Sequence, residues 1–337
     1  MTVKITAASL DRAAAILKAG GLVAFPTETV YGLGGDAFNP LSLAKIFAAK
    51  ERPFFDPLIV HVADMEGLEE AADTDALSPG LREKLEILSA RFWPGPLTIV
   101  LPKRPRLPGL VSSGLSSVAV RVPSHPAARE LIRRTGALAA PSANRFGRLS
   151  PVRAEHVEEQ LGERVDLVLD GGKTGLGVES TVLDLCGSRL LRPGGLARKA
   201  IEAVIGPLAG GPFSAASSAA APSPGMIKSH YAPATPLVLC CSSAAFPPDG
   251  SALLFFSGSS RDGWLARHAS RTGAFPPFPG RTLSETGDPA EAAANLFDML
   301  HELDRSGYAR IYAEYAPNEG LGEAINDRLS RAAAIEK

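Results

Sequence analysis

A stretch of low complexity in the second half of the chain restricts the folds that this sequence can adopt. Residues 206–236 consist mostly of Gly, Ala, Ser and Pro, and no apolar period runs through them. Such a composition cannot bury an apolar face, so we expect a linker. The chain has 337 residues, and a domain usually needs about 100–200. We therefore predict a first domain over 1–205 and a second domain over 237–337.

The first domain mixes helical and strand patterns. Leu10, Ala14 and Leu17 fall on one face of a predicted helix, and Thr6 or Ser9 can cap its start. Further helices are expected at 41–49, 81–88 and 127–135. Strands are expected at 22–25, 57–63, 96–102, 118–123, 137–144, 166–172 and 180–185. This mixture predicts an α/β domain with a twisted sheet.

One segment of the first domain lacks the composition of a regular element. Residues 26–38, PTETVYGLGGDAF, are so rich in Gly, Thr and Pro that we expect a loop crossing the end of the preceding strand.

The second domain shows a shorter version of the same pattern. Apolar runs at 237–241 and 252–256 predict two strands, and residues 289–304 form an amphipathic helical pattern. A further strand is expected at 311–316 and a final helix at 322–334. This order favours a small, open, Rossmann-like α/β sheet.

Composition excludes several classes of protein. The formal net charge is −1, so no overall field draws the chain onto nucleic acid or an anionic membrane. Cys186, Cys240 and Cys241 have neither metal-ligand nor disulfide spacing, so we expect buried, reduced thiols and a cytoplasmic protein. No run of 18 apolar residues occurs, and the N-terminal segment carries Asp11. Neither a transmembrane helix nor a signal peptide is predicted.

A phosphate-binding motif is present only in part. Residues 170–177, DGGKTGLG, contain Gly-Lys-Thr, but a P-loop also needs a glycine at the position that Leu167 occupies inside a predicted strand. The sequence also has no dinucleotide fingerprint, no zinc-protease motif and no nucleophile elbow. We therefore do not predict a P-loop.

Polar residues at the ends of strands form the remaining candidate site. The cations are Lys50, Arg52, His61, Arg121 and Arg192. The hydroxyl and amide groups are Thr27, Thr29, Ser142, Asn144, Ser150, Ser180 and Thr181. Together they suit a polyanion such as a triphosphate, which carries about four negative charges. Taken singly, each also fits a structural role, such as a solvated helix end, a core histidine or a turn.

Seven segments, in this order and at this spacing, resemble the YrdC domain. They are FPTETVYGLG (25–34), KERPFFDPLIVHV (50–62), FWPGPLT (92–98), VAVRVP (118–123), APSAN (140–144), GGKTGLGVESTVLDL (171–185) and LLRPGG (190–195). In addition, SPGMIKSHYAP (223–233) is similar to the linker signature of the longer Sua5 branch. The resemblance covers about residues 8–235, and beyond them it rests on length and coarse pattern.

The resemblance implies a fold and a reaction. The fold is a twisted α/β sheet with a large positive cavity. The enzyme is a nucleotidyltransferase, threonylcarbamoyl-AMP synthase, in which L-threonine and bicarbonate form N-carboxy-threonine. This carbamate attacks the α-phosphate of ATP, and pyrophosphate leaves. A partner complex then moves the threonylcarbamoyl group to adenosine 37 of tRNAs that read ANN codons. Direct binding of tRNA by this chain is expected to be weak or absent.

The resemblance also implies roles for individual residues. The expected threonine ligands are Thr29, His61, Arg121, Ala140, Ser180 and Thr181. The expected ATP ligands are Lys50, Arg52, Asp56, Ser117, Ser142, Asn144, Ser150, Arg192, His230 and Tyr231. The residues expected to act in catalysis are Lys50, Arg52, Ser142 and Asn144. Arg121 would take the carboxylate of threonine, and the linker would fold over the site. Mg²⁺ is expected to be held by phosphates and water rather than by protein carboxylates, with no organic cofactor.

The chain departs from the family pattern at two positions. Asp56 stands where an uncharged residue such as Asn is common, and its carboxylate would repel phosphate unless it bonds the ribose or pairs with Arg52. Ser229 precedes His230 where a basic residue is common, and Lys228 can take that role.

Two other functions stay open at this point. A carbamoyl-adenylate enzyme like the YrdC part of hydrogenase maturation proteins would carry zinc-finger and acylphosphatase modules. Such modules do not fit three cysteines. An RNA-binding module without catalysis would need a basic groove with stacking aromatics, and only 6% of the residues are aromatic. The oligomeric state, the general base and the role of the second domain do not follow from the sequence.

Overall fold

The computed structural model describes residues 1–210, 231–240, 250–272 and 280–333. Most of the predicted linker and His230 lie outside these ranges. The chain divides into two compact units. The first unit comprises residues 1–146, 150–175 and 179–227, and the second comprises 147–149, 176–178 and 228–337. Each unit is described by itself below, and the domain boundaries that the sequence suggests stay a prediction.

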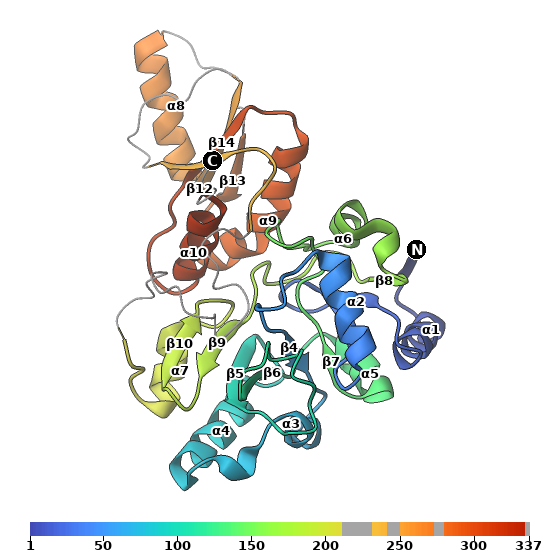
Figure 1. Cartoon of the computed structure of the whole chain (residues 1–337). Helices are drawn as coiled ribbons and strands as arrows, with labels where there is room; N and C mark the ends of the chain where they lie inside the picture. Colours follow the sequence, from blue (N-terminus) through green and yellow to red (C-terminus); the bar gives the residue numbers. More distant parts are fainter. Residues whose placement is uncertain (211–230, 241–249, 273–279, 334–337) are drawn as a thin grey trace. The chain divides into compact units, whose positions relative to one another are not determined.

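A mixed sheet of ten strands forms the centre of the first unit (Figure 1). Its order is β1-β8-β2-β3-β7-β4-β6-β5-β9-β10. The strands are β1 Thr2–Lys4, β2 Val23–Pro26, β3 Tyr31–Asp36, β4 Ile59–His61, β5 Leu97–Pro102, β6 Ser117–Arg121, β7 Leu138–Ala139, β8 Leu167–Asp170, β9 Thr181–Asp184 and β10 Arg189–Arg192. Parallel pairs, such as β4 with β6, alternate with antiparallel pairs, such as β5 with β6. The predicted α/β fold with a mixed sheet is confirmed.

The expectation of a loop over 26–38 holds for residues 27–30 but is wrong for residues 31–36, because these form β3, a strand inside the sheet. It pairs with β2 on one side and with β7 on the other. Its glycines fit this position because neighbouring side chains fill the space beside them, Phe25 at Gly34 and Ile46 at Gly35. A Cβ on Gly34 would lie 2.6 Å from Cε1 of Phe25. Tertiary packing thus outweighs the low strand propensity of glycine.

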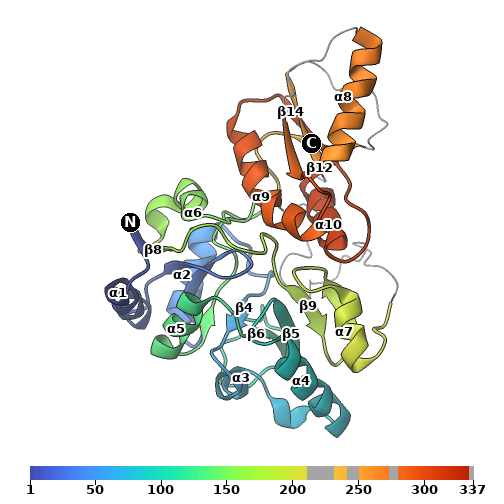
Figure 2. The ribbon, with the colours of Figure 1, turned by 180° about the vertical axis from the view of Figure 1, so that it is seen from behind.

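Seven α-helices accompany this sheet in the described part of the first unit. They are α1 Ala7–Lys18, α2 Pro40–Lys50, α3 Met65–Ala71, α4 Pro79–Phe92, α5 Pro126–Thr135, α6 Ala154–Leu161 and α7 Arg198–Ile205. Two short 3₁₀ helices also belong to the described part of this unit. They are η1 Thr74–Ala76, after α3, and η2 Gly162–Arg164, after α6. Thr6 caps α1 in a capping box with Ser9, as the sequence predicts. Figures 1 and 2 show α1 and α5 side by side. Between them Leu17 and Leu131 belong to one buried apolar cluster.

The end of α2 sets the position of two site residues. Asn39 caps its start, and Glu51 ends it in the left-handed region with φ of 55°. Lys50 is therefore the last helical residue, and it lies buried. The chain turns away directly after it, and Arg52 is buried as well.

The second unit contains a parallel sheet of four strands in the order β11-β14-β12-β13. The strands are β11 Leu237–Cys240, β12 Ser251–Ser257, β13 Gly280–Ser284 and β14 Arg310–Glu314. The helices are α8 Gly258–Thr272, α9 Pro289–Arg305 and α10 Leu321–Ala333. Figure 2 shows α9 and α10 next to each other. The predicted small α/β sheet is confirmed. The sequence reading missed α8 and β13, whose segments carry few apolar residues.

The cysteines correct one further expectation. Cys186 is exposed rather than buried, because it lies in the tight turn between β9 and β10. Cys240 is half-buried in β11, and both of these cysteines are free. Cys241 lies outside the described residues. Among the helices that the structure describes, none is both long enough and apolar enough to span a bilayer.

Candidate active site

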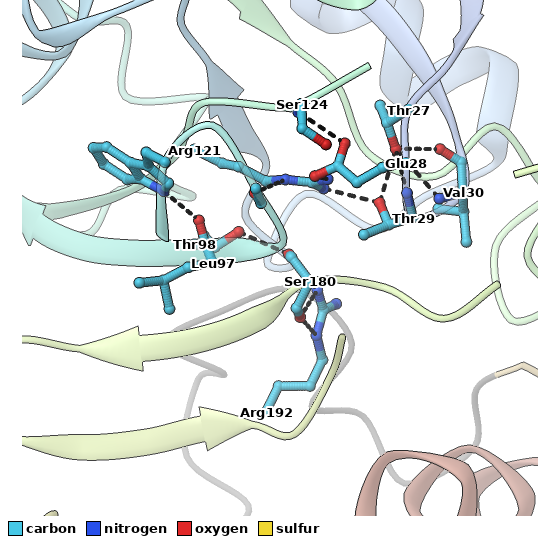
Figure 3. A network of polar contacts seen from close by, with 12 residues as sticks. Thr27, Glu28, Thr29, Val30, Leu97, Thr98, Arg121, Ser124, Ser180 and Arg192 are labelled. Carbon is cyan, nitrogen blue, oxygen red and sulfur yellow. Dashed lines mark hydrogen bonds and ion pairs between the residues drawn. The ribbon is translucent and has the colours of Figure 1, made fainter. Parts of the chain in front are cut away.

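A buried guanidinium at the end of β6 organises one part of the candidate site (Figure 3). Arg121 is only 3% exposed. Its Nε donates to the carbonyl of Gly95 at 3.1 Å, and Nη1 donates to Oγ1 of Thr29 at 3.0 Å. Its Nη2 lies 2.6 Å from Oε1 of Glu28. In Figure 3 the side chain points toward Glu28 and Thr29, on the loop between β2 and β3.

That loop is held in shape by Thr27. Its hydroxyl accepts hydrogen bonds from the backbone N–H groups of Thr29 and Val30, at 3.1 and 3.3 Å, and donates to the carbonyl of Val30 at 2.7 Å. Because its one hydrogen goes to that carbonyl, Thr29 is the donor in the 2.8 Å bond between the two hydroxyls. The Thr29 oxygen is thereby fixed beside Arg121.

His61 lies beside Arg121, because β4 and β6 are parallel and these two residues are register partners. The imidazole is buried. Burial and the nearby charge of Arg121 lower the pKa of His61 to about 3. The ring is therefore neutral near pH 7. Within the described part of the chain, its Nδ1 is buried without a hydrogen-bond partner, which makes it available to a ligand.

Ser180 connects two further strands at the site. Its Oγ lies 2.7 Å from Oγ1 of Thr98 on β5. Arg192 at the end of β10 donates to the Ser180 carbonyl from Nη2 at 2.9 Å, and to its hydroxyl at 3.2 Å. Figure 3 shows Ser180 between Thr98 and Arg192. Gly194 permits this contact, since a Cβ there would lie 2.4 Å from backbone atoms of residues 179–181.

Lys50 approaches the loop after β7. Its Nζ donates to the carbonyls of Ser142 at 2.6 Å and Asn144 at 2.5 Å. Burial and the nearby charge of Arg52 lower the pKa of Lys50 well below its ordinary value, while Asp56 acts in the opposite direction. An anion beside this amine would reverse part of that shift.

Arg52 and Asp56 form a buried ion pair. Nη2 of Arg52 lies 2.8 Å from Oδ2 of Asp56, and the same guanidinium donates to the carbonyls of Asp56 and Pro57. Burial raises the pKa of Asp56, although Arg52, Lys50 and Arg192 pull it down. From the sequence we expect the Asp56 carboxylate to repel phosphate unless it pairs with Arg52 or bonds the ribose. The structure shows the pairing with Arg52.

Three other expected ligands, Ser150, Thr181 and Ala140, each donate a hydrogen bond to another part of the protein. Ser150 donates its hydroxyl to Oε1 of Glu179. Thr181 donates to the carbonyl of Leu196 at 2.6 Å. The backbone N–H of Ala140 donates to Ile59 at 2.9 Å.

Two further expected ATP ligands are Ser117 and Tyr231, which lie in different units. Ser117 begins β6, opposite Pro102. Tyr231 belongs to the second unit, where its buried ring lies 5.8 Å from that of Phe297 and 5.1 Å from the guanidinium carbon of Arg328.

The first unit thus contains ten of the predicted residues in three linked groups. Arg121, Thr29 and His61 form the first group. The second contains Ser180 and Arg192, and the segment 93–98 joins the two, because Gly95 contacts Arg121 and Thr98 contacts Ser180. The third group contains Lys50, Arg52, Asp56, Ser142 and Asn144. It lies within electrostatic range of the second, since Arg192 affects the pKa of Asp56.

The sequence reading missed three polar residues in these groups. They are Glu28, which contacts Arg121, Thr98, which contacts Ser180, and Glu179, which contacts Ser150. All three lie inside motifs quoted above for the family resemblance, and Glu28 stands between two predicted site threonines. A carboxylate in a predicted anion site looks unfavourable from sequence, and only the structure supplies its cationic partner.

Comparisons with known proteins identify the family. A family model of Sua5, YciO and YrdC proteins, described as "Telomere recombination", matches residues 15–194. A second model, described as "Threonylcarbamoyl-AMP synthase, C-terminal domain", matches residues 196–334.

Two curated relatives cover nearly the whole chain. The threonylcarbamoyl-AMP synthase of Bacillus subtilis is 42% identical, over 96% of this chain and 92% of the relative. The threonylcarbamoyl-AMP synthase of Pyrococcus abyssi is 39% identical, over 95% and 92%. The crystal structure of P. abyssi Sua5 complexed with L-threonine matches with a TM-score of 0.82 at 38% identity, covering 99% of this chain and 96% of that one. With both domain models and relatives of full length in agreement, the chain belongs to the Sua5 family of two-domain YrdC proteins.

Proposed function

We propose that this chain is a threonylcarbamoyl-AMP synthase that forms L-threonylcarbamoyladenylate and pyrophosphate from L-threonine, bicarbonate and ATP. The observation that carries the proposal is that Lys50, Arg52, Arg121 and Arg192 are all buried in the first unit, within the three linked groups described above. Cations are rarely buried unless they are paired or serve a ligand. A nucleotide beside an amino acid supplies the negative charge that such a set needs.

Arg121 and His61 form the centre of the amino-acid half of the proposed site. The guanidinium has five N–H donors and uses three of them on protein acceptors, so two remain for the carboxylate of threonine. The unpartnered Nδ1 of His61 is a second contact. Thr29 and Ser180 hold the amine and hydroxyl, and Ala140 and Thr181 line the pocket.

The nucleotide half is built around Lys50 and Arg52. The ammonium of Lys50 has three donors, of which two go to the carbonyls of Ser142 and Asn144, and the third binds a phosphate oxygen. Arg52 and Arg192 add charge on the same side. The remaining members of this half within the first unit are Asp56, Ser117, Ser142, Asn144 and Ser150. His230, which lies outside the described residues, and Tyr231, which belongs to the second unit, stay expected ATP ligands.

Catalysis in this proposal rests on position and charge. An oxygen of the carbamate attacks the α-phosphorus, the bond to the bridging oxygen breaks, and pyrophosphate leaves with the electron pair. Holding the reacting atoms about 3–3.5 Å apart replaces a rare encounter between two solutes. Lys50 and Arg52, with Ser142 and Asn144, stabilise the charge that develops on the phosphate oxygens.

Mg²⁺ belongs to this proposal as the companion of ATP. Within the described ranges, no three His, Cys, Asp or Glu side chains lie close enough together to hold a metal ion. Two carboxylates in the groups described above, Glu28 and Asp56, are already paired with Arg121 and Arg52. This donor set fits a cation that is held by phosphate oxygens and water. When bound, Mg²⁺ neutralises part of the triphosphate charge.

The product is an intermediate in tRNA modification. We propose that a separate transfer complex takes the threonylcarbamoyl group to adenosine 37 of ANN-decoding tRNAs, and that this chain acts in the cytoplasm. Its own affinity for tRNA is weak, in line with a net charge of −1. The expected role of the linker as a cover that keeps water from the labile product falls mostly on residues 211–230, outside the described part of the chain.

The test is incubation of the purified chain with ATP, bicarbonate and threonine, followed by mass detection of the adenylate and assay of pyrophosphate. Both products should depend on threonine. Serine should react less well if the pocket encloses the threonine methyl group. A chain that forms no adenylate but binds RNA with a steep salt dependence would be the RNA-binding module instead.

A further inference from the structure

Glu28 is a partly buried acid at the candidate site that the proposed reaction does not use. Its side chain is 15% exposed. Oε1 lies 2.6 Å from Nη2 of Arg121, and Oε2 accepts a hydrogen bond from the backbone N–H of Ser124 at 3.0 Å. Both oxygens therefore face hydrogen-bond donors. Ser124 lies just before α5, so the carboxylate connects the loop between β2 and β3 to the segment that follows β6 (Figure 3).

The contacts of Arg121 show what this carboxylate does to the guanidinium. Gly95, Thr29 and Glu28 hold three different nitrogen atoms of the group. A planar group held at three points has no freedom to rotate. One N–H on each terminal nitrogen remains to bind the carboxylate of a ligand.

Glu28 does not occupy the place of the substrate carboxylate. A stand-in for the substrate would engage Arg121 with both of its oxygens. Glu28 uses only one oxygen on Arg121 and anchors the other on a backbone N–H. The carboxylate is also a fixed anion, because Arg121 keeps the pKa of Glu28 below its ordinary value despite burial. It is thus a permanent partner that a ligand has no need to displace.

We propose that Glu28 is a positioning residue that sets the affinity for the amino-acid substrate by orienting Arg121 toward its carboxylate. This inference rests on the proposed function, in which Arg121 binds that carboxylate. An amide cannot replace the Glu28 carboxylate. The NH₂ group of the amide is a donor, and it would face another donor, either the guanidinium of Arg121 or the N–H of Ser124.

The test compares Glu28→Gln with the wild-type chain in two binding titrations. One ligand is L-threonine and the other is L-threoninol, in which a hydroxymethyl group replaces the carboxylate. Calorimetry gives both Kd values, and steady-state assays give KM for ATP. Glu130→Gln is the matched control, because Glu130 pairs with Arg134 on the surface of α5.

We expect Glu28→Gln to weaken threonine binding by about 10- to 100-fold, the range for a charged hydrogen bond. The Kd for threoninol and the KM for ATP should stay within about twofold of wild type, and Glu130→Gln should change none of these values. Equal loss for both ligands would mean that Glu28 only supports the fold, and it would overturn the inference. Unchanged or tighter threonine binding would overturn it as well.

A second variant covers the case in which Glu28→Gln does not fold. Glu28→Asp keeps the charge but withdraws it by one methylene. It should weaken threonine more than threoninol, and an equal effect on both ligands would again contradict the role. If the wild-type chain bound no threonine at all, the proposed function itself would be wrong. If instead the wild-type chain and the Glu28→Gln variant bound threonine equally well, the proposed function would stand and only the role of Glu28 would be wrong.

Discussion

At the scale of single residues, the site combines one neutral ring with several fixed charges. His61 and Arg121 are neighbours on parallel strands, and both are buried. Protonating His61 would place two cations side by side away from water, which is the reason for its low pKa. The structure keeps the histidine neutral, so that Arg121 is the positive group that meets a carboxylate.

This low pKa predicts how stability changes with pH. The pKa of His61 is about 3 in the fold and 6.5 ordinarily, so the unfolded chain takes up the proton first as the pH falls. The contribution of the neutral ring is complete above pH 6.5 and is lost toward pH 3, by at most about 1.4 kcal/mol per pH unit. Between pH 7 and pH 5 the loss should be about 2 kcal/mol.

Replacing the histidine removes this proton linkage. Urea unfolding of His61→Asn at pH 7 and pH 5 should show a fall in unfolding free energy that is about 2 kcal/mol smaller than in the wild-type chain. Equal falls in the two proteins would show that His61 titrates normally in the fold.

The sequence predicts the cations of the site, but of their partners it predicts only Asp56 for Arg52. Lys50, Arg52, Arg121 and Arg192 stand in motifs that a reader can find, and all four are buried in the first unit. Which acceptor holds each cation depends on contacts across long stretches of sequence. Glu28 and Arg121 are 93 positions apart in the sequence, and no local sequence pattern predicts such a pair.

At the scale of secondary structure, β3 shows where local propensity fails. Its glycines predict a loop, whereas the structure gives a strand paired on both sides. The cause is the ring of Phe25, which takes the space where side chains would otherwise stand. Helices with clear caps, such as α1 and α9, follow the sequence closely. The weakly apolar α8 and β13 do not.

The packing of β3 yields a second prediction. Gly34→Ala would place a Cβ 2.6 Å from Phe25, which is fully buried and has no room to move. We expect a loss of about 1–3 kcal/mol in unfolding free energy from overpacking. Gly80→Ala is the control, since Gly80 lies in α4 with open space around it.

The control should shift stability in the opposite direction. Alanine favours the helix over glycine by about 0.5–1 kcal/mol, so Gly80→Ala should stabilise the chain slightly. Thermal unfolding of the two variants beside wild type separates the effects. A Gly34→Ala variant as stable as wild type would show that Phe25 can yield.

At the scale of the whole molecule, Tyr231 joins the end of the linker to the second unit. Its ring is 1% exposed and lies against Phe297 of α9 and Arg328 of α10. Tyr231→Ala should destabilise the second unit by about 3–5 kcal/mol, as buried aromatic truncations do. Tyr231→Phe keeps the ring and should cost much less. If Tyr231 also serves the proposed lid, the alanine variant should release less pyrophosphate.

Fluorescence can follow the second unit separately. The chain has two tryptophans. Trp264 belongs to the second unit, in α8, and Trp93 to the first. In a Trp93→Phe background, the unfolding of Trp264 should move to lower temperature with Tyr231→Ala and stay nearly in place with Tyr231→Phe. An unchanged transition in the alanine variant would contradict an anchoring role.

The pairing of β1 with β8 has a consequence for how the chain is made. Residues 2–4 find their only strand partners, among the described residues, at 168–170. During synthesis the first strand therefore leaves the ribosome long before its neighbour exists. The sheet stays open at that edge until half of the protein has been translated, and such distant pairings form slowly. Release of residue 170 is thus the earliest moment at which β1 can join the sheet, and all ten strands exist only once Arg192, the last residue of β10, has been made.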